Sequence, residues 1–160
     1  MKIIRYAVPA LALAALSAGR AAAQSATQDV SFEVQAINQI TFSGSPSLVI
    51  STATAGSAPT SATANATYAI TTNETDRKIT AGIDSDMPAG TTLSVSLAAP
   101  SGGASAGAVQ LGTTAQDVVT GVSTVNASGL NVTYTLQATA AAGVVPAGTR
   151  TVTYTIVAGA

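Results

Sequence analysis

Large apolar residues alternate with small or polar residues along most of the chain. Runs of this kind cover residues 30–34, 68–70, 93–97, 130–136 and 152–156, where Val, Ile, Leu, Phe or Tyr takes every second position. Side chains two residues apart lie on the same face of a β-strand. Each run therefore predicts a strand with one buried face and one exposed face.

Residues that favour turns separate the alternating runs, and no stretch of residues 24–160 follows a helical period. Gly, Pro, Asn, Asp and Ser cluster at residues 44–46, 73–76, 84–90, 100–103, 128–129 and 143–148. These boundaries predict strands near residues 28–37, 40–43, 47–52, 66–72, 78–83, 91–98, 108–111, 117–125, 131–139 and 149–158.

About nine or ten short strands at this spacing predict an all-β fold, an antiparallel β-sandwich of immunoglobulin-like or Greek-key type. A closed barrel is the second choice. The alternation fails after Ala36 and around residues 118–122, where a β-bulge or a corner is expected. Residues 53–66 contain no large apolar side chain and predict a long surface connection or an edge.

The first 23 residues have the three parts of a secretory signal peptide. Lys2 and Arg5 supply positive charge, residues 7–18 form an uncharged apolar run, and residues 21–23 are alanines that suit signal peptidase. The apolar run is shorter than the roughly 20 residues of a membrane-spanning helix. We therefore expect a cleaved signal at residues 1–23, a single domain at 24–160 without a membrane span, and a bacterial protein that is secreted to the extracellular space, cell surface or periplasm.

The composition removes most kinds of reactive chemistry. The chain contains no Cys and no His, which excludes disulfides, thiolate or imidazole metal ligands, and Ser/His or Cys/His catalytic pairs. Six basic and seven acidic residues give a net charge of −1, which leaves no basic surface for nucleic acid. Only 4% of the residues are aromatic, too few for the sugar-stacking cleft of a glycoside hydrolase.

Acidic residues gather at 73–78 and 84–86, where carboxylate oxygens could in principle bind calcium. Their spacing does not match an EF-hand loop, and a solvated hairpin tip followed by a turn is the favoured interpretation. We expect no catalytic residue, no metal, no cofactor and no enzyme activity.

The expected first strand of the mature chain carries its largest apolar side chains on one face. Residues 28–36 would extend about 30 Å at about 3.3 Å per residue, with Val30, Phe32 and Val34 on that face. Such a strand pairs within its own domain or completes the sheet of a neighbouring molecule by β-strand addition. Val30, Phe32 and Val34 are therefore the candidate core or strand-assembly positions.

The plan of the chain resembles a known class of bacterial surface proteins. A signal peptide, an alternating N-terminal strand, a Thr-rich sandwich and the final strand Arg-Thr-Val-Thr-Tyr-Thr-Ile-Val at residues 150–157 are its parts. Over most of the mature chain these parts resemble bacterial fimbrial subunits and spore-coat-U-like surface proteins. The resemblance implies a subunit of a filament or coat.

We expect a non-enzymatic structural subunit of a cell-surface filament, coat or matrix, with further copies of itself or other exported surface proteins as partners. The alternative is a secreted binding module for a glycan or another exported protein. Its binding surface would be made by loops 84–90 and 98–107.

Overall fold

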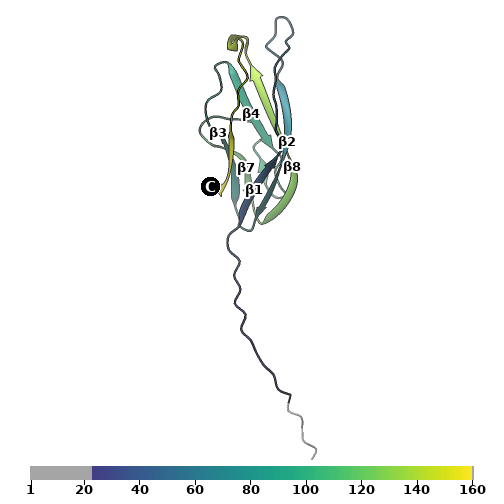
Figure 1. The fold of residues 1–160 in the computed structure, drawn as a ribbon, viewed down its shortest axis with the longest axis vertical. Coiled ribbons are helices and arrows are strands. Elements are labelled where there is room, and N and C mark those ends of the chain that lie inside the picture. Colours follow the sequence, from purple (N-terminus) through teal and green to yellow (C-terminus); the bar gives the residue numbers. More distant parts are fainter. Residues whose placement is uncertain (1–22, 160) are drawn as a thin grey trace, which may run out of the picture. The chain divides into compact units, whose positions relative to one another are not determined.

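The structure is a computed structural model that describes residues 23–159, and the chain divides into two compact units. The first unit ends at Glu33, and its described residues, 23–33, contain no helix or strand. The second unit begins at Val34 and holds every strand of the described chain (Figure 1). The predicted signal peptide, residues 1–23, lies outside the described residues except for Ala23. Among residues 23–159, no helix has the length and apolar character needed to cross a membrane.

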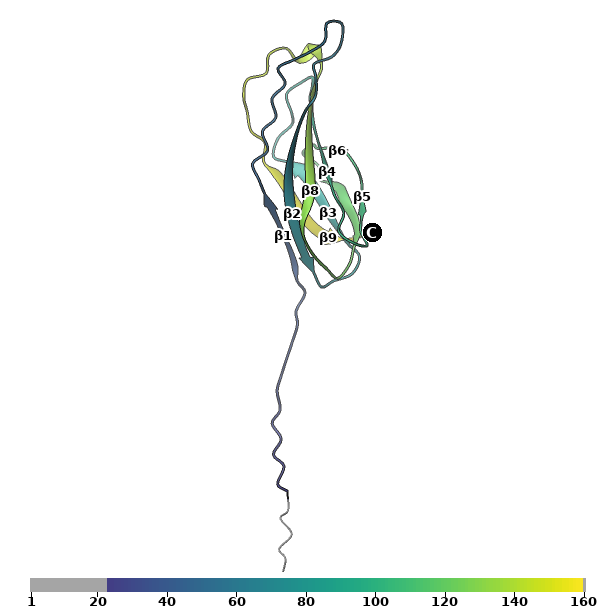
Figure 2. The same cartoon turned by 90° about the vertical axis from the view of Figure 1, so that its right-hand side faces the viewer.

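Within residues 23–159, nine strands form two antiparallel sheets, which confirms the predicted all-β sandwich (Figures 1 and 2). The five-stranded sheet has the order β1-β2-β8-β4-β6 and the four-stranded sheet has the order β5-β7-β3-β9. The elements are β1 (Asn38–Ser43), β2 (Ala62–Thr72), β3 (Arg77–Ile83), β4 (Thr91–Leu97), β5 (Ala104–Ser105), β6 (Val109–Gln110), β7 (Gln116–Val122), β8 (Val125–Ala138), the 3-10 turn η1 (Ala140–Ala142) and β9 (Val152–Ala158).

The alternating residues supply the core between the sheets. In β3 and in β4 every second residue is buried, as the period of two requires. Burying a Val, Leu or Ile side chain stabilises the fold by about 1.5–3 kcal/mol. The buried apolar residues are Tyr68, Ile70, Ile79, Ala81, Ile83, Leu93, Val95, Leu97, Leu111, Val118, Val119, Val122, Val132 and Tyr134.

From β3 onward, each strand lies in the opposite sheet from the strand before it. Two of the crossing connections are short and lie side by side at one end of the sandwich. They are the 73–76 turn between β2 and β3 and the 123–124 turn between β7 and β8. The Asp76 N–H donates to Ser123 Oγ at 2.9 Å, and the Thr124 N–H donates to the Glu74 carbonyl oxygen at 2.9 Å.

Three local predictions from the sequence are wrong. The expected strand at 28–37 is not formed, because the first ladder begins only where Asn38 pairs with Thr72. Residues 47–52 form no strand, and the next pairing along the chain is an isolated bridge between Ala53 and Pro59. The expected turn at 128–129 lies inside β8.

Bulges explain the last of these differences and confirm another expectation. The pairing of β2 with β8 shifts register between Tyr68 and Ile70, opposite Gly129, whose φ is 67°. A glycine in this conformation is typical of a bulge, so β8 continues through it. The pairing of β3 with β7 also shifts, opposite residues 118–122, where the broken alternation predicted a bulge or a corner.

Candidate functional site

One side of the sandwich carries two long edge strands. β1 ends the five-stranded sheet and β9 ends the four-stranded sheet, and in the described part of the chain each pairs with a single neighbour, β2 and β3 respectively. β1 and β9 lie at the ends of their sheets opposite β6 and β5, respectively, and the Phe42 ring of β1 contacts the Tyr154 ring of β9. We call residues 38–43 and 152–158 together the β1–β9 edge.

The β1–β9 edge lacks the features that usually protect an exposed sheet edge. At the other side of the sandwich, β5 and β6 are only two residues long each, whereas β1 has six residues and β9 has seven. Neither long strand contains a charged residue or a proline, and both keep a continuous register with their neighbours. Short strands, charges, prolines and bulges are the devices that prevent pairing with further strands. The edge is therefore competent to accept another strand.

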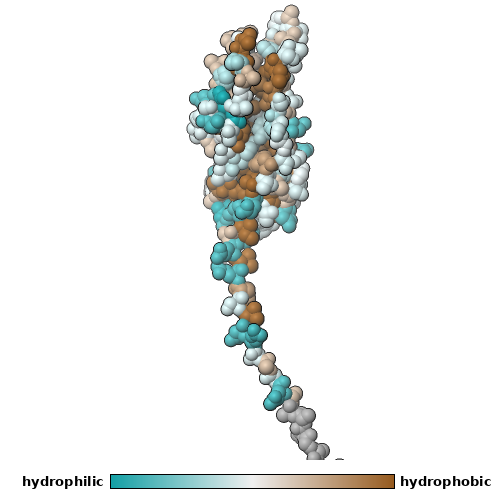
Figure 3. Space-filling model, in the orientation of Figure 1, coloured by the Kyte–Doolittle hydropathy of each residue, from teal (hydrophilic) through white to brown (hydrophobic). Residues whose placement is uncertain are grey.

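The inward side chains of this edge are only half-buried. Ile79 in β3 is 0% exposed, whereas Ile156, its direct partner across the ladder in β9, remains partly exposed. The difference follows from position, because Ile156 has no strand on its outer side. Figure 3 shows hydrophobic residues at the surface of the sandwich in the view that contains β1 and β9. The half-buried apolar side chains of the edge that pack on the core are Ile40, Phe42, Val152, Tyr154 and Ile156.

Aromatic rings connect the two strands of the edge. The Phe42 ring in β1 stacks on the Tyr154 ring in β9 with centroids 4.0 Å apart, and on Tyr68 at 5.5 Å. The hydroxyl groups of Tyr154 and Tyr134 are 2.8 Å apart. Burial, reinforced by this hydrogen bond, raises the pKa of Tyr154 above its usual value. The hydroxyl therefore stays protonated to a higher pH than usual, and its hydrogen bond with Tyr134 restrains the ring.

A polar network ties the start of β1 to the 73–76 turn. Asn38 Nδ2 donates to Glu74 Oε2, and Arg77 forms an ion pair with the same carboxylate. The hydroxyl of the buried Thr72 donates to Asn38 Oδ1 at 2.8 Å. The hydrogen bond from Asn38, followed by the contact with Arg77, lowers the pKa of Glu74.

This network predicts a specific response to acid. A carboxylate whose pKa is lower in the folded state stabilises the fold above its ordinary pKa of about 4.5, and this contribution disappears as the pH falls below that value. The variant Glu74→Gln should melt at a lower temperature than the wild type at pH 7. The difference should shrink as thermal unfolding is followed by circular dichroism from pH 7 to pH 3.

The control for this prediction is Asp29→Asn, which removes an exposed carboxylate in the first unit. Its melting temperature should follow the wild type at every pH. A difference between Glu74→Gln and the wild type that stays constant down to pH 3 would contradict the role of the Glu74 charge.

The three positions expected in the first strand lie at the surface. The side chains of Val30, Phe32 and Val34 are 75%, 93% and 80% exposed, and the core of the sandwich is made without them. None belongs to a strand. Their role in assembly stays a prediction.

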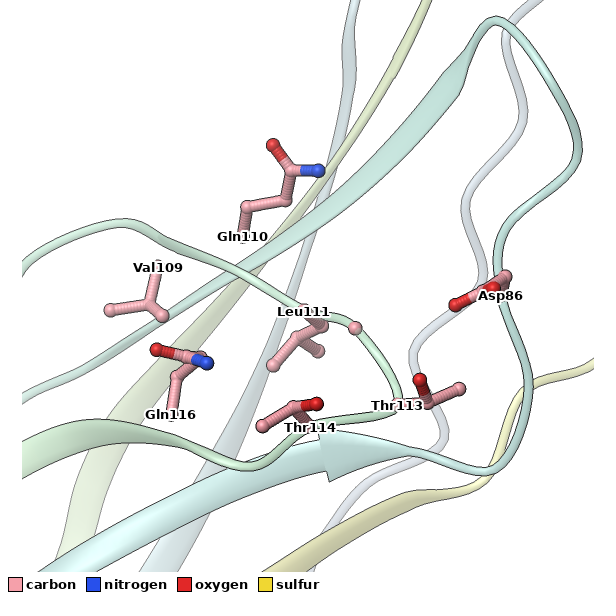
Figure 4. Close-up of a pocket in the computed structure, with 8 residues that line it drawn as sticks. Asp86, Val109, Gln110, Leu111, Thr113, Thr114 and Gln116 are labelled. Atoms are coloured by element: carbon pink, nitrogen blue, oxygen red, sulfur yellow. The ribbon is translucent and has the colours of Figure 1, made fainter.

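The two loops expected for a binding module lie far apart. Loop 84–90 precedes β4 and loop 98–107 follows it, so the seven residues of β4 separate them by roughly 20 Å. A pocket of about 440 Å³, open to solvent, lies beside the first loop and is lined by Asp86 together with residues 109–114 and Gln116. In Figure 4, Asp86 points toward the loop that carries Thr113, while Gln110 points away. Loop 98–107 contributes nothing to this pocket.

Two of the four acidic residues considered for calcium are used within the protein. Glu74 pairs with Arg77, and Asp84 Oδ1 accepts a hydrogen bond from the Thr151 N–H at 3.2 Å. In residues 23–159, no three Asp or Glu side chains come together as a metal site. No protein-family model, curated protein or solved structure significantly matches this chain.

Proposed function

We propose that this protein is an exported, non-enzymatic structural subunit of a cell-surface filament, coat or matrix. In this proposal, residues 28–36 of one copy pair as a strand with the β1–β9 edge of another copy. One observation carries the proposal: the sandwich has a long, uncharged edge with half-buried apolar side chains, and the same chain holds an alternating segment whose apolar side chains are exposed.

The dimensions of the segment and the edge support this pairing. Residues 28–36 would extend about 30 Å as a strand, while the seven residues of β9 extend about 23 Å. Val30, Phe32 and Val34 repeat every second residue, as do Val152, Tyr154 and Ile156 in β9. A strand aligned beside β9 can therefore place one apolar side chain near each half-buried one.

Residues 28–36 have one apolar face that could be buried at the edge and one polar face that could remain in water. Phe32 is 93% exposed, and burying a side chain of this size stabilises an interface by about 1.5–3 kcal/mol before the costs of ordering. Asp29, Ser31 and Glu33 alternate with the apolar residues, so their side chains would face water. The donating and accepting surfaces differ, so the contact is heterologous and generates rings or open filaments.

A peptide competition experiment tests the proposal. The full-length gene is expressed, and the purified product is followed by light scattering and negative-stain microscopy at increasing concentration. Association without any added ligand is expected. A synthetic peptide of residues 24–37 should compete for the edge and reduce association, whereas the same peptide with Phe32→Asp should have little effect.

Two outcomes would refute the proposal. A protein that remains monomeric at every concentration does not act as a self-assembling subunit. A protein that associates equally well with and without excess wild-type peptide uses a surface other than strand addition at the β1–β9 edge.

A further inference from the structure

A single side chain holds the residues that precede β1. The Ile37 N–H donates to Asn73 Oδ1 at 2.8 Å, and Asn73 Nδ2 donates to the Gln35 carbonyl oxygen at 2.8 Å. The backbone N–H of Asn73 donates to the Ile37 carbonyl oxygen at 3.3 Å. Asn73 thus contacts the backbone of the preceding segment at three points, all within the second unit.

These hydrogen bonds extend the β1–β2 ladder past the end of β2. Asn38 pairs with Thr72, so the antiparallel register places Ile37 opposite Asn73. The backbone leaves the sheet at this point, because residues 73–76 turn into β3 and Asp76 has a φ of 49°. A primary amide has the same kinds of donor and acceptor as a peptide group. The Asn73 side chain therefore takes the place of the next peptide groups of β2. It keeps residues 35–37 extended in line with β1.

We propose that Asn73 is a positioning residue that directs residues 28–34 to the edge of a second copy and prevents their insertion into the edge of their own molecule. This inference rests on the proposed function. It concerns which edge the segment reaches, whereas the proposed function concerns whether strand addition occurs at all.

The positions of the strand ends show what self-insertion would require. β1 begins at the end of the sandwich that holds the 73–76 turn, and β9 finishes there, where the Gly159 N–H donates to the Asp76 carbonyl oxygen at 2.7 Å. The segment would have to reverse direction just before Asn38 to run along its own edge. While Asn73 holds residues 35–37, the reversal has to use residues that come earlier.

The sequence before residue 35 is unsuited to such a reversal. Tight hairpin turns favour Gly, Asn or Asp at positions with positive φ, and residues 30–37 contain none of these. A turn at this place would also include Phe32 and Val34, so two of the three apolar side chains that fit the edge could not lie along it. A second copy receives all three, because no reversal is needed.

Substitutions of Asn73 test the positioning role. Asn73→Ala should speed up hydrogen exchange at the Ile37 amide and weaken association on the order of tenfold, since the freed backbone must be ordered again on assembly. Asn73→Asp keeps the acceptor for the Ile37 N–H but cannot donate to Gln35, so it should retain slow exchange and show an intermediate association. Asn126→Ala, at an exposed position of β8, is the control and should match the wild type.

A second pair of variants tests the choice between the two edges directly. Gln35→Asn with Ala36→Gly supplies a sequence that favours a hairpin turn, and it leaves the backbone groups that Asn73 binds. With Asn73 present, this double variant should still associate. With Asn73→Ala added, it should become a monomer in which the segment is protected from proteases by its own edge.

The results separate the two proposals. If the wild type does not associate, the proposed function is wrong. If the wild type associates, and Asn73→Ala associates equally well despite fast exchange at Ile37, Asn73 has no positioning role. Equal association of the double variant with and without Asn73 would also overturn the inference.

Discussion

The variant Phe32→Asp is expected to abolish association of the protein and to leave its melting temperature unchanged. Phe32 is 93% exposed, so the substitution removes no contact from the core. In the proposed assembly the same side chain is buried beside β9, where an unpaired carboxylate costs several kcal/mol. A cost of about 3 kcal/mol weakens association by more than a hundredfold. Light scattering and thermal unfolding on the same sample measure both quantities.

The control for Phe32→Asp is Ser31→Asp, its neighbour on the opposite face of the expected strand. Ser31→Asp adds the same charge where the side chain would face water, and it should associate nearly as well as the wild type. Equal loss in both variants would point to net charge as the cause. Normal association of Phe32→Asp would show that this face is not the one inserted.

The second large effect concerns Ile79 and Ile156, which are partners across the β3–β9 ladder. Ile79→Ala should lower the free energy of unfolding by about 2–5 kcal/mol, because Ile79 is 0% exposed and the substitution leaves a cavity. Ile156→Ala should cost clearly less in the monomer, because water already reaches this half-buried side chain. Urea unfolding at a concentration where the protein is monomeric provides the comparison.

Ile156→Ala should in addition weaken association, since the strand that joins the edge would cover Ile156. Ile79→Ala has no such contact to lose, and its folded fraction should associate normally. If the two substitutions cost the same in the monomer, then Ile156 is already fully covered and the β1–β9 edge is not open.

The local pattern was sufficient to predict the fold class and several strands. β3 and β4 lie within one residue of their predicted bounds, because turn residues flank a clear alternation on both sides. The prediction of a strand at residues 47–52 was wrong. Leu48, Val49 and Ile50 are consecutive and do not alternate with polar residues, and Val49 is 73% exposed. A strand also needs a partner, and a local pattern carries no information about which distant segment will supply one.

The candidate site could be predicted only in part for the same reason. The alternation of β9 is like that of β4, yet β4 lies between two strands and β9 ends its sheet. Position within a sheet depends on the pairing of distant segments, so the half-buried edge has no local signal. Asn73 was recognisable as a turn residue, but its contact with Gln35 spans 38 positions and depends on the completed β1–β2 ladder.

The alternation of successive strands between the two sheets has a consequence for the kinetics of folding. Ala62 in β2 pairs with Leu136 in β8, and Ile83 in β3 pairs with Val152 in β9. These ladders therefore cannot form until segments that are synthesised much later are present. Topologies dominated by such distant pairings fold in milliseconds to seconds, far more slowly than those built from local hairpins. In a chain that emerges N-terminus first, neither sheet can be completed until the last quarter of the polypeptide is available. The C-terminal residues therefore determine when this protein first becomes resistant to proteolysis.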